Sequence, residues 1–211
     1  MRGPVIAIDG PAAAGKGTLA RRIAQELDLP YLDTGLLYRA VGRRVLDAGG
    51  DPADPTAAEM AACALKPTDL HRNDLRGPVA DAAAASVAAI PEVRRALLDF
   101  QRNFASERGA VLDGRDIGTV IFPDALAKLY VTASLAERAH RRWLELQAKG
   151  VAADLAIVEA DMLARDTRDA PNMRKADDAE LLDTSSLDAD AAFRRALEVI
   201  RHRLANGATL G

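Results

Sequence analysis

The stretch that decides the fold is Gly10-Pro11-Ala12-Ala13-Ala14-Gly15-Lys16-Gly17-Thr18, which follows the apolar run Pro4–Asp9 and opens a helical pattern. Its spacing, G-x-x-x-x-G-K, is that of a phosphate-binding loop between a strand and a helix. The two outer glycines let the main chain turn so that successive amides point into one concavity, and the helix N-terminus adds partial positive charge. The sequence therefore predicts a P-loop for a nucleoside triphosphate, with Lys16 reaching the terminal phosphates.

The residue after the lysine departs from this motif. Most P-loops carry Ser or Thr there as a Mg²⁺ ligand, whereas this sequence has Gly17 followed by Thr18. We expect Thr18 to donate to a phosphate oxygen. We also expect Mg²⁺ to accompany the nucleotide, held through phosphates and water, because the ion usually keeps several waters. Its direct protein ligands are left unassigned, and the three histidines are too widely separated to form a metal site.

Short apolar runs alternate with helical patterns along the chain. Each run is continuous, as expected for strands that helices cover on both faces. The predicted strands are Pro4–Asp9, Pro30–Asp33, Ala110–Asp113, Ala127–Thr132 and Glu180–Asp183. The predicted helices are Gly17–Leu27, Leu36–Ala48, Pro91–Glu107, Leu135–Lys149, Leu155–Asp166 and Ala189–Ala205. This order predicts an α/β fold with a five-stranded parallel sheet flanked by helices.

Two regions interrupt the alternation. Between Gly49 and Ile90 the pattern weakens: Asp51-Pro52, Asp54-Pro55, Pro67 and Gly77-Pro78 are turn signals, and an Ala-rich helix follows. We expect one domain over residues 1–211, with an insertion outside the sheet at about residues 50–105. The polar stretch Asp166–Asp178 lacks periodicity and predicts a surface loop.

The composition narrows the possible functions. Hydrophobic residues make up 49% and charged residues 28%, which excludes a wholly disordered chain. Aromatic residues are only 4% and the net charge is −3, so neither base stacking nor a basic footprint favours a nucleic-acid partner. The apolar run after Met1 is too short for a signal peptide, and we expect no membrane partner. The single Cys63, expected to be a small buried hydrophobic residue, predicts a cytoplasmic location.

Several stretches together carry a family resemblance. The form Gly15-Lys16-Gly17-Thr18 is typical of nucleoside monophosphate kinases. The others are Leu32–Arg39 (LDTGLLYR), Asp113–Asp124 (DGRDIGTVIFPD), Glu137–Arg142 (ERAHRR) and Arg165–Asp169 (RDTRD). In these stretches the chain resembles bacterial cytidylate kinases, from the P-loop to Leu182-Asp183-Thr184-Ser185. The G-R-D-x-G-T pattern is specific to that family.

The resemblance implies transfer of the terminal phosphoryl group of ATP to CMP or dCMP, with Mg²⁺ accompanying ATP, by a cytoplasmic monomer. It also implies that the insertion binds the monophosphate and that a lid lies at about residues 149–175. The implied ATP-binding residues are Gly10, Pro11, Ala12, Ala13, Ala14, Gly15, Lys16, Gly17, Thr18 and Arg141. The implied CMP-binding residues are Thr34, Arg39, Arg94, Arg115, Asp116 and Asp169. The implied catalytic residues are Lys16, Arg165, Arg168 and Asp33.

The chemistry of these residue types agrees with the implied roles. Guanidinium groups match phosphate oxygens, and a carboxylate at Asp116 can accept from the exocyclic amine of cytosine. Arg138, Arg141 and Arg142 lie at i, i+3 and i+4 of one predicted helix, where they form either part of the lid or a salt-bridged face with Glu137 and Glu145. Asp113, at a strand end, either orients Mg²⁺ through water or is an ordinary turn residue.

Two positions depart from the family pattern. Position 172 is Asn172 where the family commonly has Arg, and the following segment is about four residues short; Arg174 or Lys175 are the candidates to replace that charge. Ala85 stands where the family has a base-contacting Ser, with Ser86 next to it. These departures concern the lid and base recognition, not the P-loop.

Other functions remain open on the sequence alone. One is a P-loop kinase for UMP, AMP or a non-nucleotide acceptor, and another is a nucleotide-binding switch without transferase activity. Against a GTPase switch, Arg174 occupies the place of Asn in the nearest approach to N-K-x-D. A nucleic-acid-directed ATPase lacks the expected basic surface.

Overall fold

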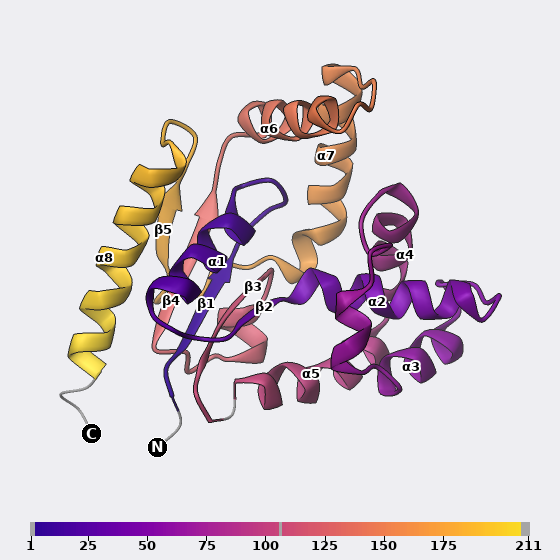
Figure 1. Cartoon of the computed structure of the whole chain (residues 1–211), viewed down its shortest axis with the longest axis horizontal. Helices are drawn as coiled ribbons and strands as arrows, with labels where there is room; N and C mark the ends of the chain where they lie inside the picture. Colours follow the sequence, from indigo (N-terminus) through magenta and orange to yellow (C-terminus); the bar gives the residue numbers. More distant parts are fainter. Residues whose placement is uncertain (1–2, 106, 208–211) are drawn as a thin grey trace. The chain divides into compact units, whose positions relative to one another are not determined.

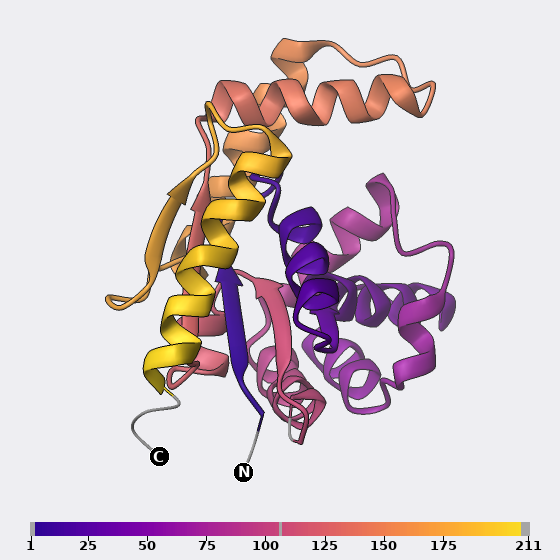
Figure 2. The same cartoon turned by 60° about the vertical axis from the view of Figure 1, so that its left-hand side comes forward.

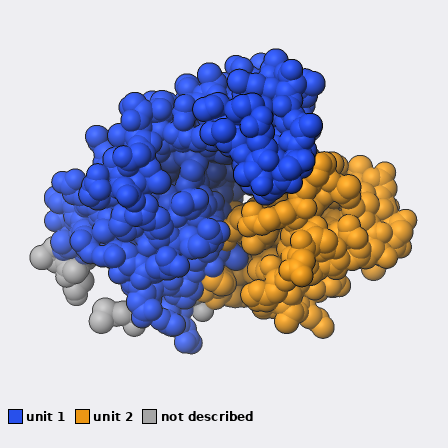
Figure 3. All heavy atoms as spheres, turned by 45° about the horizontal axis from the view of Figure 1, so that its top comes forward, with its two compact units in different colours: residues 1–32, 107–211 blue, residues 33–106 orange. Residues whose placement is uncertain are grey.

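The computed structural model describes residues 3–105 and 107–207. The chain divides into two compact units, residues 1–32 with 107–211 and residues 33–106 (Figure 3). The first unit contains the P-loop and most of a β-sheet, and the second is helical where the structure describes it.

The sheet is five-stranded, with the order β2-β3-β1-β4-β5. Its strands are β1 (Val5–Asp9), β2 (Tyr31–Asp33), β3 (Ala110–Gly114), β4 (Ala127–Thr132) and β5 (Glu180–Asp183). The central strand β1 pairs in parallel with β3 on one side and β4 on the other, with Ile8 opposite Asp113 and Leu129. Because parallel strands end at one edge of the sheet, the ends of β1 and β3 bring Asp9 and Asp113 to the P-loop edge. The predicted α/β fold with a parallel sheet is confirmed.

Helices α1 (Lys16–Glu26) and α8 (Ala189–Gly207) pack with the sheet in one apolar core (Figures 1 and 2). This core joins Ile6 and Ile8 of β1 to Ile23 of α1 and Ile200 of α8, all fully buried. Burial of each such side chain stabilises the fold by about 1.5–3 kcal/mol. The core therefore fixes the helix that the P-loop opens.

Helices α6 (Leu135–Ala148) and α7 (Leu155–Asp169) form a hairpin in the same unit (Figure 1). Ser134 and Asp154 cap their N-termini by accepting from backbone amides two to three residues on. A small apolar cluster of Ala139, Val158 and Met162 joins the two helices. Helix α7 runs on to Asp169 and a 3₁₀ turn, Ala170–Asn172, so the predicted loop start at Asp166 is wrong by three residues.

The second unit consists of α2 (Thr34–Asp47), α3 (Pro55–Cys63), the 3₁₀ helix Pro67–His71, α4 (Pro78–Ala88) and α5 (Pro91–Phe104). Helix α2 lies close against α4, where a Cβ on Gly42 would come within 2.7 Å of the Ala83 Cβ. The sequence did not predict α3, and Cys63 at its end is exposed, so the expectation of a buried cysteine is wrong. Its side chain lies on the outward face of the helix, whereas the buried face carries Ala58 and Ala62.

Within the described residues, no helix has the length and apolar character needed to cross a membrane.

Candidate active site

The P-loop has the main-chain geometry of a phosphate cradle. Gly10 has φ of 142°, and a Cβ there would lie 1.9 Å from the Val131 carbonyl oxygen, so no other residue fits. Gly15 is left-handed, with φ of 86°, and immediately precedes α1. The buried Lys16 side chain folds back, and its Nζ donates to the Pro11 carbonyl oxygen at 2.8 Å. The ammonium group is therefore held at the loop that it is expected to serve.

A cavity of about 340 Å³ adjoins the P-loop. Its apolar lining includes Leu19, Leu187 and Ala192, and its polar lining includes Thr18 and Arg141. Ligand pockets of this kind combine an apolar wall with a few polar groups that fix orientation. Thr18 thus lines the cavity next to the loop, and the cavity can hold the base or sugar of a bound nucleotide.

Arg141 is fixed at this cavity by three hydrogen bonds to two residues. Its Nε donates to Glu137 at 2.9 Å, Nη1 to the Thr184 hydroxyl at 3.0 Å, and Nη2 to the Thr184 carbonyl at 2.6 Å. The Thr184 hydroxyl also lies 3.2 Å from the carbonyl oxygen of Ala14 in the P-loop. Arg141, Thr184 and the P-loop therefore form one connected group.

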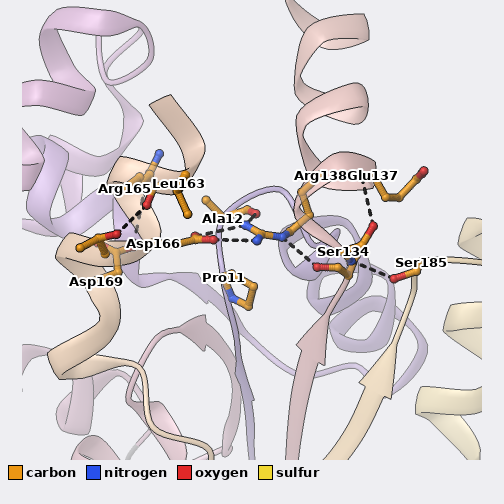
Figure 4. A network of polar contacts seen from close by, with 12 residues as sticks. Pro11, Ala12, Ser134, Glu137, Arg138, Leu163, Arg165, Asp166, Asp169 and Ser185 are labelled. Carbon is orange, nitrogen blue, oxygen red and sulfur yellow. Dashed lines mark hydrogen bonds and ion pairs between the residues drawn. The ribbon is translucent and has the colours of Figure 1, made fainter. Parts of the chain in front are cut away.

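Arg138 joins the P-loop to both helices of the hairpin (Figure 4). Its buried guanidinium donates to both oxygens of Asp166, at 3.1 and 2.6 Å, to the Ala133 carbonyl at 3.0 Å and to the Ala12 carbonyl at 3.3 Å. A fork-to-carboxylate pair of this kind fixes direction as well as distance. Arg138, expected either in the lid or on a salt-bridged helix face, is thus buried and links α6 to α7 and to the P-loop by hydrogen bonds.

A second cluster surrounds Asp169 at the end of α7. Its Oδ2 accepts from Arg115 Nε at 2.8 Å and lies 3.9 Å from Arg165 Nε. The structure therefore brings Arg115, Asp169 and Arg165 together, whereas the side chain of Arg168 is exposed. Arg174 pairs with the exposed Asp177, and Lys175 donates to the carbonyls of Ala176 and Ala179, so both have local partners.

Three acidic residues of the first unit lie buried at the ends of strands β1 and β3. Asp9 accepts from the amides of Ile117 and Gly118, and burial raises its pKa from 3.8 to about 6. Asp113 accepts from the Tyr31 hydroxyl at 2.8 Å, and Asp116 precedes a short π-helical turn, Ile117–Ile121. No group of three or more His, Cys, Asp or Glu in the described residues could hold a metal ion by itself.

In the second unit, the predicted site residues gather around the start of α2. Thr34 is buried, and the position of a Cβ on Gly35 would have Asp33 Oδ1 at 3.0 Å and Arg39 Nη1 at 3.2 Å. Arg39 Nε donates to Asp81 at 2.9 Å. The Arg94 guanidinium lies 5.9 Å from the centre of the Tyr38 ring, within reach of a cation–π contact.

A sequence model of the family described as cytidylate kinase matches residues 6–202. This match extends over most of the chain. The chain belongs to the cytidylate kinase family.

Named relatives agree with this assignment. The cytidylate kinase of Granulibacter bethesdensis is 60% identical over 203 residues, covering 94% of this chain and 97% of that protein. The cytidylate kinase of Acidiphilium cryptum is 60% identical over 207 residues, covering 96% and 98%. Among solved structures, a gluconokinase from Sinorhizobium meliloti gives a TM-score of 0.53 at 14% identity, covering 98% of this chain and 96% of that one. At that identity the likeness shows the fold alone.

The hydrogen-bonding roles of Tyr31 and Asp9 were not predicted from the sequence. Neither residue belongs to a local motif. The Tyr31 hydroxyl donates to Asp113, 82 positions along the chain, and Asp9 accepts from the amide of Ile117, 108 positions along the chain. The available signal for Asp9 was a carboxylate ending a buried strand run directly before a cytidylate kinase P-loop. Ser86, the neighbour of Ala85, donates to the Ala82 carbonyl of its own helix at 3.3 Å.

Proposed function

We propose that this protein transfers the terminal phosphoryl group of ATP to CMP or dCMP, giving CDP or dCDP. The observation that carries the proposal is the P-loop of a cytidylate kinase family member, with Lys16 held against the loop and a base-sized cavity beside it. A nucleotide needs both features: amides and an ammonium group for the phosphates, and a partly apolar pocket for the rest.

On the donor side, the amides of Gly10–Thr18 hold the phosphates of ATP and Lys16 neutralises their charge. The cavity lined by Leu19, Leu187 and Arg141 takes the adenosine part. Arg141 presents a flat guanidinium, fixed through Glu137 and Thr184, on which a base can stack.

On the acceptor side, the arginines Arg39, Arg94 and Arg115 bind the phosphate of CMP, and Thr34 adds a hydroxyl. Asp116 is buried just after the end of β3, and its carboxylate accepts from the exocyclic amine of cytosine. The carbonyl that uracil has at the same position would be repelled by this carboxylate. Asp169 accepts from Arg115 Nε at 2.8 Å, and Arg115 Nη1 donates to the Gly114 carbonyl at 3.3 Å, so the guanidinium is held in one orientation.

The acceptor phosphate is itself the nucleophile, so the reaction needs neither a covalent intermediate nor a dedicated base. Catalysis is then positioning plus charge neutralisation by Lys16, Arg165 and Arg168, with Asp33 orienting the acceptor. Mg²⁺ supplies further charge neutralisation on the ATP phosphates. Mg²⁺ usually keeps several waters and needs few direct protein ligands. No group of three or more His, Cys, Asp or Glu in the described ranges could bind it directly, and the buried Asp113 beside Gly17 would hold it through water.

We also propose that the enzyme is a cytoplasmic monomer, with an acceptor-binding insertion and a lid at about residues 149–175. An exposed thiol at Cys63 suits a reducing compartment. One chain supplies both the donor-binding and the acceptor-binding residues, so the reaction does not require a second copy.

The test is a comparison of initial rates with MgATP and CMP, dCMP, UMP or AMP as acceptor, alongside Lys16→Ala. We expect CMP and dCMP to be the best acceptors. Lys16→Ala should lower the rate by at least about 100-fold, the loss typical of removing one transition-state donor, with an unchanged melting temperature. Equal rates on all acceptors, or near-normal activity of Lys16→Ala, contradict the proposal.

A further inference from the structure

The Asp9 carboxylate links two loops that are far apart in sequence. It is 5% exposed, its Oδ1 accepts from the Ile117 amide at 2.8 Å, and its Oδ2 accepts from the Gly118 amide at 2.8 Å. Asp9 is the last residue of β1 and directly precedes Gly10 of the P-loop. Ile117 and Gly118 directly follow Arg115 and Asp116. One side chain therefore joins the phosphate loop to the loop that carries two proposed acceptor-binding residues.

The amides of the turn at Ile117–Ile121 donate to two different acceptors, the Asp116 carbonyl and the Asp9 side chain. The turn's later amides, those of Val120 and Ile121, point to the Asp116 carbonyl oxygen at 2.9 and 3.3 Å. Its first two amides point to Asp9 instead. The first amides of a helical turn have no partner within the turn, and an acceptor carboxylate there is favoured by their partial positive charge. Asp9 thus fixes the turn immediately after Asp116.

This arrangement keeps a carboxylate in an unfavourable place. The pKa of Asp9 is about 6, above the usual 3.8: burial and the nearby Asp116 charge raise it, while the two amides and Lys16 lower it. A neutral side chain would avoid the desolvation but could not accept two hydrogen bonds in this geometry. The double acceptor is the property that only the carboxylate provides.

We propose that Asp9 is a positioning residue for the acceptor nucleotide: it holds the turn after Asp116 so that Arg115 and Asp116 keep the places needed to bind CMP. This inference rests on the proposed function. It assigns Asp9 to the acceptor side although Asp9 adjoins the donor loop in sequence.

Asp9→Asn tests the proposal because asparagine keeps the shape but can accept from only one of the two amides. The Michaelis constant for CMP is measured at saturating MgATP, and the dissociation constant for MgATP is measured by calorimetry. We expect the Michaelis constant for CMP to rise about tenfold or more, since a buried amide loses its partner. The dissociation constant for MgATP should stay within about threefold.

Gly118→Ala approaches the same contact from the other side and serves if Asp9→Asn does not fold. A Cβ there would lie 3.3 Å from Asp9 Oδ2 and 3.1 Å from Lys128 Cδ, which pushes the amide away from the carboxylate. The control is Ile200→Ala, a fully buried core change in α8. It should lower the melting temperature and leave both constants unchanged.

The outcomes separate cleanly. A selective loss for CMP in Asp9→Asn or Gly118→Ala supports the proposal. An unchanged Michaelis constant for CMP, or equal weakening of CMP and MgATP, overturns it. Failure of the wild-type enzyme to phosphorylate CMP at all would instead remove the proposed function, and the two results cannot be confused.

Discussion

At the scale of single residues, the position after the P-loop lysine shows how a neighbour can supply a missing group. A Cβ on Gly17 would lie 3.6 Å from the Tyr31 hydroxyl and 3.7 Å from Asp113 Oδ2. The Tyr31 hydroxyl donates to the other oxygen of Asp113 at 2.8 Å. Thr18, the hydroxyl expected to compensate for Gly17, lines the cavity instead. The hydroxyl nearest to a Cβ at position 17 is that of Tyr31, at 3.6 Å.

Tyr31→Phe removes this hydroxyl and keeps the ring that packs under Arg21, whose guanidinium lies 5.4 Å from the ring centre. The Asp113 carboxylate then loses a donor, and we expect it to be less well oriented for its proposed contact with Mg²⁺-bound water. We expect the Mg²⁺ concentration needed for half-maximal tightening of ATP binding to rise roughly threefold to tenfold, the range for one hydrogen bond. The measurement is ATP calorimetry over a Mg²⁺ series.

Binding of ATP in EDTA is the control for Tyr31→Phe and should match the wild type, because the P-loop is untouched. Adding Gly17→Ser to Tyr31→Phe should restore part of the Mg²⁺ response. A Mg²⁺ response identical in Tyr31→Phe and wild type would show that the hydroxyl has no part in holding the ion.

The residue scale also marks the limit of prediction from sequence. The P-loop is a contiguous pattern, so its strand, turn and helix could be predicted from spacing alone. Tyr31, Asp9 and Arg138 act through partners from distant segments, and no local pattern names those partners. Arg138 was visible as a helix charge, but only the fold shows that its guanidinium is buried against Asp166.

At the scale of elements, Arg138 determines how α7 is held beside the P-loop. Its bidentate pair with Asp166 ties α6 to α7, and a further bond reaches the Ala12 carbonyl (Figure 4). Arg165 and Arg168, the proposed transition-state charges, flank Asp166 on the same helix. The Arg138 guanidinium, together with the apolar cluster of Ala139, Val158 and Met162, therefore fixes the direction in which α7 presents them.

Arg138→Lys keeps the charge but cannot form the fork. We expect the turnover number to fall at least about tenfold, since breaking one partner of a buried pair is strongly unfavourable. Amide hydrogen exchange in α7 should become faster, because the helix loses its tie to α6. Rates at saturating substrates and exchange mass spectrometry provide the two measurements.

Arg142→Lys is the matched control, since Arg142 lies on the same helix and pairs with the half-exposed Glu145 at 2.9 Å. Solvent-exposed ion pairs contribute little to stability, so neither the turnover number nor the amide exchange rate in α7 should change. Equal effects of the two substitutions would mean that the Arg138–Asp166 pair has no special role.

The boundaries of helices and strands could be predicted where a sequence pattern is typical of only one kind of structure. The five strands were found because each apolar run is short, and four of the five end at an aspartate. Helix α3 was missed because Asp54-Pro55 was taken as a turn, whereas Asp54 is an N-cap that accepts from the amide of Thr56 and Pro55 is the first helical residue. Proline before a helix and proline in a turn are the same local signal.

At the scale of the whole molecule, the protein retains a buried charge that opposes its own stability. The folded-state pKa of Asp9, about 6, lies above its ordinary value of 3.8, so folding favours the protonated form. The stabilising contribution is fully present below about pH 4 and is lost as the pH rises through 6. A shift of this size corresponds to roughly 3 kcal/mol at neutral pH. The carboxylate that we propose to position the acceptor loop therefore lowers the stability of the fold at neutral pH.

The free energy of unfolding of wild type and Asp9→Asn, measured by urea denaturation between about pH 4.5 and pH 7.5, checks this conflict. Groups that do not interact with Asp9 cancel in the difference, so its pH dependence reports Asp9 together with the charges coupled to it, Asp116 and Lys16. We expect the difference to move in favour of the variant as the pH rises, by about 2 kcal/mol across this range, because only the wild type must bury a charge. The same variant is expected to bind CMP more weakly, so a gain in relative stability would accompany a loss of acceptor affinity. A difference that stays flat with pH would show that Asp9 ionises in the folded protein as easily as in the unfolded chain, and that its carboxylate is kept without a stability cost.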